Sequence, residues 1–174
     1  MPSSRQLISS QVLTSSAATV TFSAIPGTFK DLVLRISART DQNSTTAFLT
    51  YYLNAGGTGL QSESYLGAGG STTETGRTSN SNGGIGSGGF ISLSGNTSTS
   101  NTFGSAEIYI PSYTASRNKA TGNVGMGETN ATAIQMGITA GLWRNTAAVT
   151  TIALSPSGSN FLSGSSFYLY GLAN

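Results

Sequence analysis

The hexapeptide GIGSGG, residues 84–89, has residue types and spacing that match a dinucleotide-binding motif. It fits G-x-G-x-x-G, with Gly84, Gly86 and Gly89 at the three glycine positions. That motif binds a pyrophosphate where a buried strand runs through a tight turn into a helix. Here the polar run STTETGRTSNSNG precedes it, and FISLSGN, which alternates like a strand, follows it. Because 12 of the 23 glycines fall within residues 55–89, the match reflects composition, and we predict no cofactor site.

The six carboxylates are the other candidates for chemistry, because two of them at a suitable separation would make a glycosidase pair. Glu107 lies in SAEIYI, whose apolar residues alternate with it. We therefore expect Glu107 to point outward and to pair with Arg35 or Arg39 on a neighbouring strand. Residues 41–43 begin like a calcium-binding loop, but the glycine and the bidentate glutamate of such a loop do not follow at the required spacing. The sequence predicts neither a catalytic nor a metal site, and hence no enzyme.

The composition excludes further classes of function. The chain has no cysteine and no histidine, which rules out disulfides, thiolate or imidazole metal ligands and nucleophiles activated by histidine. Its net charge of +2 comes from eight basic and six acidic residues spread thinly along the sequence, so no basic cluster predicts a nucleic-acid partner. No stretch approaches the ~20 apolar residues of a membrane span, and the start of the chain lacks the apolar core of a secretory signal. We predict no membrane partner.

An alternation of apolar and polar residues dominates the chain and predicts β-strands. Residues 31–40 place their leucines and isoleucine on one face, and residues 131–143 alternate in the same way. Further strands are predicted at 6–13, 18–22, 47–53, 89–94, 103–110, 119–126, 148–154 and 166–172. About ten short strands with turn-rich links and no helical pattern indicate one all-β domain over residues 1–174, an antiparallel β-sandwich with the winding of a jelly roll.

The shared parity of these runs predicts which side chains face the core. We expect the inward set to be Leu32, Leu34, Ile36, Ile108, Ile110, Ile134, Met136, Ile138, Ile152 and Leu169.

Three places offer contact residues. The Gly/Ser/Thr-rich segment 55–89 is predicted to be a long surface excursion, because loops of more than ~15 residues in compact domains are commonly binding segments; its candidate contacts are Tyr65 and Arg77. Residues 1–10 are predicted to form an N-terminal arm, since termini can reach a neighbour and order on binding. Trp143 is predicted to cap the sandwich edge or to lie in a subunit interface, where tryptophan is enriched. The complete set of candidate contacts is Arg5, Leu7, Ile8, Tyr65, Arg77 and Trp143.

Four segments taken together resemble small structural proteins of tailed bacteriophages: FSAIPGTFKDLVLRISART, NTFGSAEIYIPSY, AGLWRNTAAVTTIAL and NFLSGSSFYLYGLAN. They occur in order over nearly the whole chain, with residues 55–89 least similar. The ending F-x-L-Y-G-[LI] of such proteins corresponds here to Phe167, Leu169, Tyr170, Gly171 and Leu172.

The resemblance implies a virion component without catalytic activity, made in the host cytoplasm. Such proteins include capsid decoration, or cement, proteins, which bind the major capsid protein and commonly form homotrimers. The chain has no fibrous repeat, and only residues 1–10 could serve as a separate attachment region, which favours a decoration protein on the capsid surface. The alternative is a tail or fibre component that binds a receptor or a carbohydrate.

Overall fold

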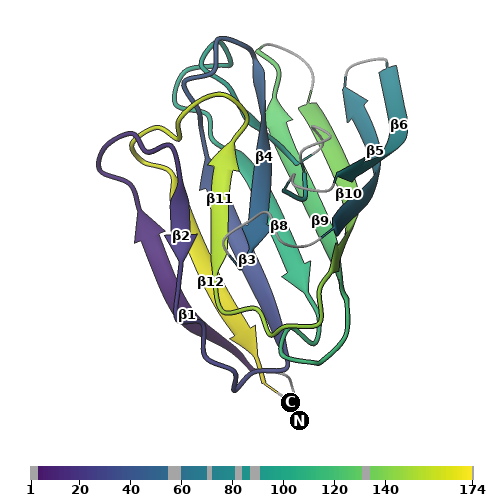
Figure 1. Cartoon of the computed structure of the whole chain (residues 1–174). Coiled ribbons are helices and arrows are strands. Elements are labelled where there is room, and N and C mark those ends of the chain that lie inside the picture. Colours follow the sequence, from purple (N-terminus) through teal and green to yellow (C-terminus); the bar gives the residue numbers. More distant parts are fainter. Residues whose placement is uncertain are drawn as a thin grey trace.

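The computed structural model describes residues 4–54, 60–69, 72–80, 84–86, 91–130 and 134–173. These residues form twelve strands in two packed antiparallel sheets, an all-β sandwich in one domain (Figure 1). The strands are β1 (Arg5–Val12), β2 (Val20–Phe22), β3 (Asp31–Ala38), β4 (Thr46–Leu53), β5 (Leu60–Gly69), β6 (Thr72–Asn80), β7 (Ser92–Ser94), β8 (Gly104–Ile110), β9 (Lys119–Glu128), β10 (Ile134–Arg144), β11 (Ile152–Pro156) and β12 (Ser166–Leu172). The predicted sandwich is confirmed.

The two sheets differ in size. The larger has the strand order β1-β12-β3-β8-β9-β10-β5-β6, and the smaller has the order β2-β11-β4-β7. The smaller sheet therefore covers only part of the inner face of the larger one. No helix in the described part of the chain has the length and hydropathy to cross a membrane.

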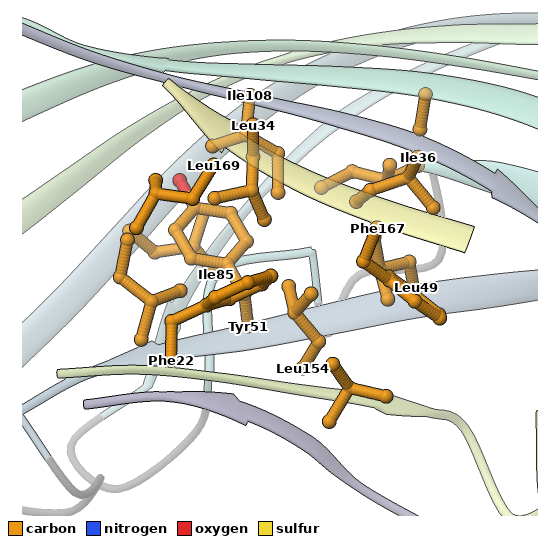
Figure 2. Close-up of a cluster of buried hydrophobic side chains, with 14 of the residues drawn as sticks. Phe22, Leu34, Ile36, Leu49, Tyr51, Ile85, Ile108, Leu154, Phe167 and Leu169 are labelled. Atoms are coloured by element: carbon orange, nitrogen blue, oxygen red, sulfur yellow. The ribbon is translucent and has the colours of Figure 1, made fainter. Parts of the chain in front are cut away.

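The core lies between the sheets and follows the predicted alternation over most strands. Figure 2 shows Leu34 and Ile36 of β3 with Phe167 and Leu169 of β12, opposite Leu49 of the smaller sheet. Each such side chain contributes about 1.5–3 kcal/mol when it is fully buried. The inward positions confirmed by burial are Leu32, Leu34, Ile36, Ile108, Ile110, Ile152 and Leu169.

The predicted parity of β10 is wrong. Ile134, Met136 and Ile138 point outward and are 65%, 42% and 50% exposed. The inner face of β10 instead carries Gly137, Thr139, Gly141 and Trp143, all buried.

Close approach of the two sheets explains this reversal. On the neighbouring strand β9, a Cβ at Gly125 would overlap the backbone nitrogen of Ser92, and one at Gly127 would lie 2.5 Å from the carbonyl oxygen of Leu93. Glycine leaves room for the β7 backbone at these positions of β9. On β10 itself, a Cβ at Gly141 would lie 2.5 Å from the Ile85 side chain, so the inner face of β10 has no room for a row of isoleucine and methionine.

The segment 55–89 is not the irregular excursion that we predicted. Strands β5 and β6 form a hairpin that extends the larger sheet beyond β10, at one side of the molecule (Figure 1). The chain then returns to the core, where Ile85 is 1% exposed and exchanges two backbone hydrogen bonds with Tyr51. The residues of both strands are mostly polar or glycine, so they lack the apolar alternation that predicts a strand.

The motif glycines serve packing in this return segment. Gly84 and Gly86 are buried, and a Cβ at Gly86 would overlap the carbonyl oxygen of Leu49. The φ of Gly86 is +92°, a conformation that favours glycine. Gly89, the third motif glycine, lies outside the described residues.

Candidate interaction surface

The outer face of strands β9, β10 and β5 carries a row of exposed apolar side chains. In the sheet register Ile138 lies between Val124 and Leu66, and Met136 lies opposite Met126. Side chains directly opposite on neighbouring strands have Cβ atoms about 4.5–5.5 Å apart, so these residues form one continuous surface. We call it the apolar patch, and it consists of Leu66, Val124, Met126, Ile134, Met136 and Ile138.

The apolar patch is large for a single chain. Five of its side chains are 42–65% exposed, which amounts to roughly 500 Å², near the upper end of what monomers leave uncovered. Patches of this size in soluble proteins mark contact sites.

A hollow lies on each side of the apolar patch. One has a volume of about 370 Å³ over β10 and the β5–β6 hairpin. Its lining includes the small side chains of Ser62, Ser64 and Ala140. The other, of about 330 Å³, is lined by residues that include Val124 and Met126 of the patch itself. The outer face therefore alternates between raised apolar side chains and depressions.

The charged side chains near this face are few. Arg35 Nε donates to Glu107 Oε2 at 3.0 Å, and both side chains are exposed, which confirms the outward orientation of Glu107 and one of its two predicted partners. Arg39, the other predicted partner, is instead buried. Its guanidinium donates to the backbone carbonyls of four residues in the loop between β7 and β8: Asn96, Ser98, Thr99 and Thr102.

Lys119 is a second internal cation. Its Nζ donates to the carbonyl oxygens of Ala115 and Arg117 at 2.7 Å and of Ala147 at 2.8 Å. It also lies 5.7 Å from the ring centre of Trp143. Burial, and then the nearby Arg117, lower the pKa of the Lys119 ammonium.

Trp143 itself is 1% exposed. The prediction of Trp143 as a contact residue is therefore wrong for this chain, because a side chain enclosed by its own core offers no surface to a partner. Its inward direction follows from the parity of β10.

Two of the described carboxylates accept hydrogen bonds from backbone amides and polar side chains of the chain. Asp31 accepts hydrogen bonds from the Tyr109 hydroxyl at 2.8 Å and from the Ser112 amide at 2.7 Å. Asp41 accepts from the amide and from Nδ2 of Asn160, and these donors lower the pKa of Asp41 by stabilising its charged form.

Polar side chains also meet inside the sandwich. Glu63 is buried and accepts from the Gly86 amide at 2.5 Å. The Tyr51 hydroxyl lies 2.6 Å from Thr121 Oγ1 and 3.1 Å from Asn123 Oδ1, and it donates its one proton to either of them. Burial raises the pKa of this hydroxyl well above its ordinary value, so Tyr51 stays neutral and serves as a fixed donor between the sheets.

The remaining predicted contacts lie at two opposite edges of the larger sheet. Arg5, Leu7 and Ile8 belong to β1, which is a strand rather than the predicted arm. It pairs with β12 on both sides of a register shift between Leu7 and Ser9. Tyr65 and Arg77 belong to the β5–β6 hairpin at the other edge, on the far side of the molecule (Figure 1). The structure does not bring the two groups together.

Within the hairpin the two predicted contacts also differ in direction. Arg77 is exposed and lines the hollow of about 370 Å³. Tyr65 is only partly exposed and covers Gly76 of β6, where a Cβ would overlap the tyrosine ring. The next residue, Leu66, points outward and is 51% exposed, and it is not among the predicted contact residues.

The apolar patch is not among the predicted surfaces, because its residues on β10 are predicted to lie in the core. A signal was present: glycines recur at odd positions of β9 and β10, at Gly125, Gly127, Gly137 and Gly141. Glycines on one face of a strand mark a close approach of another backbone, which leaves the bulky residues for the opposite face.

A scan against protein-family models, a search of curated proteins and a search of solved structures find no match for this chain. A functional assignment therefore rests on the residues and on the surfaces that they form.

Proposed function

We propose that this chain is a non-catalytic structural protein of a bacteriophage virion, a decoration protein that binds the outer surface of the capsid shell and stabilises it. The observation that carries the proposal is the β1 edge of the sandwich, where the exposed Leu7 lies beside a hollow, which suits a protein that works by contact. The described carboxylates Asp31, Asp41, Glu63, Glu107 and Glu128 accept hydrogen bonds within the chain. The resemblance to phage structural proteins supplies the partner, the major capsid protein.

The predicted jelly-roll winding belongs to this proposal. Strands β1, β12, β3 and β8 lie side by side in the larger sheet, and β2, β11, β4 and β7 form the smaller one. Successive strands of this set cross between the sheets at every connection except β4 to β7, as expected for eight strands wound as two Greek keys. The homotrimer implied by the resemblance also stays a prediction.

The proposed contact with the shell is the β1 edge of the sandwich. A hollow of about 490 Å³ lies there, lined by residues that include Leu7 and Ile8 of β1 and Phe29. Leu7 is 49% exposed, and Arg5 is exposed at the start of the strand. An edge strand with apolar side chains and a neighbouring hollow can accept a segment of a coat subunit.

A tail or fibre component that binds a carbohydrate is the second candidate. It is favoured by a group of tyrosines on the outer face of the same sheet, since the register sets Tyr109 and Tyr170 on either side of Val33 and Tyr168 beside Arg35. Aromatic rings on a sheet face can stack against sugars.

The test is to strip or delete the protein from the particles and heat them beside intact ones. The proposal expects rupture at a lower temperature without the protein and recovery when purified protein is added back. Leu7→Lys should abolish recovery, whereas Ser100→Lys, a change in an exposed loop, should not. Equal resistance to heat and to osmotic shock, together with lost adsorption to cells, would overturn the proposal in favour of the tail component.

A further inference from the structure

We propose that the apolar patch is an interface between copies of this chain, so that a second copy covers the outer face of β9, β10 and β5. The inference goes beyond shell binding, because it needs no capsid and depends on surface features of the larger sheet alone. The exposed area, the shape and the charge of this sheet face support it.

The area approaches what a stable interface needs once the rim is included. The patch exposes roughly 500 Å², and a stable interface buries about 800 Å² on each partner. Apolar and small residues continue the same face next to the patch, with Ala140 and Leu142 further along β10 and Ser64 and Ala68 on β5. These neighbours, together with Arg77, which lines the same hollow, extend the contact face toward that area.

The shape of the face is complementary to itself. Along the outer side of β10, the bulky residues Ile134, Met136 and Ile138 are followed by Ala140, which lines the hollow of about 370 Å³. The face thus holds raised side chains and a depression of side-chain size next to each other. A second copy brings the same raised side chains to this depression, whereas any other protein would have to match it independently.

The charge distribution permits two copies to meet. The charged groups that border the patch are held by other groups of the chain. Arg35 pairs with Glu107 at 3.0 Å, and Glu128, which lies opposite Ile134 in the sheet register, accepts a hydrogen bond from the Thr99 amide. Burying charges without partners is costly, and this face avoids that cost when it meets its own copy. Arg77 lines the hollow from the edge strand β6 and is exposed, so its guanidinium can stay in water.

The experiment measures the molar mass of the purified chain by light scattering from about 1 to 100 μM, a range that covers ordinary micromolar association. Wild type should be heavier than one chain of 17.7 kDa. Ile138→Glu places a charge in the interface and should weaken self-association about 100-fold, the loss expected for a central contact residue. Ala140→Trp fills the hollow from an exposed position and should weaken it as well.

The matched control is Val12→Glu, which places the same charge on a residue of β1 that is 59% exposed at the opposite edge of the sheet. It should leave the mass unchanged, and circular dichroism should show that all variants keep the fold. A wild type that stays monomeric at every concentration overturns the inference, and so does an oligomer that withstands both Ile138→Glu and Ala140→Trp. Self-association that persists while purified protein fails to restore heat resistance would overturn the proposed function and leave this inference standing.

Discussion

Single residues reveal how a chain with few charges uses them. Arg39 and Lys119 each bind several backbone carbonyls of nearby loops. A buried carbonyl without a donor costs about 1–3 kcal/mol, so one cation that satisfies several of them holds a loop without the help of regular secondary structure. These two cations therefore stabilise loops of their own chain and are not available for chemistry.

Lys119→Met tests this role. Methionine keeps much of the apolar stem but leaves the carbonyls of Ala115, Arg117 and Ala147 without their donor. We expect a loss of about 3 kcal/mol in the free energy of unfolding, measured by urea denaturation. Lys30→Met is the matched control on an exposed lysine and should change stability by less than about 0.5 kcal/mol. Equal effects of the two substitutions would contradict the role.

Asp41 gives a pH dependence with a defined sign. Its pKa is lowered below the ordinary value of 3.8 by the amide and side chain of Asn160, so its contribution to stability is present above that value and is lost as the pH falls through the folded-state pKa. Wild type should be more stable than Asp41→Asn at about pH 6, and the difference should shrink toward zero near pH 2. Urea unfolding of both proteins at the two pH values checks this. A difference that does not change with pH would refute it.

At the scale of elements, the contact between β9 and β7 determines which way the neighbouring strands face. Backbone packs against backbone there, because the inner positions of β9 include Gly125 and Gly127. On β10, Gly141 packs closely against Ile85. The close packing of both strands directs their bulky side chains to the outer face, where these form the apolar patch.

Two glycines of β9 make a matched pair of substitutions. Gly125→Ala would push a methyl group into the β7 backbone at Ser92 and should cost about 3 kcal/mol, as overpacking of a core does. Gly122→Ala points outward and meets nothing within 4 Å, so it should be neutral or slightly stabilising. Thermal unfolding of the two variants measures the contrast. A Gly125→Ala variant as stable as wild type would show that the sheets are not in direct backbone contact.

At the scale of the whole molecule, the two proposed surfaces lie at opposite edges of one sheet. β1 is one edge, and the apolar patch lies toward the other edge, beside the β5–β6 hairpin. A protein that binds a shell at one edge and its own copies at the other would engage several coat subunits at once. Linked binding of this kind raises the apparent affinity by 10² to 10⁴ without any new contact, as a rough range.

Ile138→Glu therefore has a predicted effect on shell binding as well. The variant keeps the β1 edge, so it should still bind stripped particles to the same saturation, but with an apparent affinity about 100-fold weaker than wild type. A titration of labelled protein onto stripped particles measures both quantities. Unchanged affinity would separate self-association from shell binding.

The sequence alone determined the class of the fold and most of its strands. Period-two alternation located ten strands close to their observed bounds, because a half-buried strand needs apolar residues on one face. It also located the core of β3, β8 and β12, and the outward direction of Glu107. These properties depend on local pattern, which a single sequence contains.

Tertiary structure decided what alternation leaves open. The alternation in β10 leaves open which face is buried, and packing inside the sandwich decides it. The β7 backbone covers Gly125 and Gly127 of β9, and the Ile85 side chain covers Gly141 of β10, so the bulky face is the outer one. Strands β5 and β6 are polar and glycine-rich, and they become strands because β10 offers them an edge to pair with. The apolar patch arises from both choices, since it spans strands that meet only in the folded sheet.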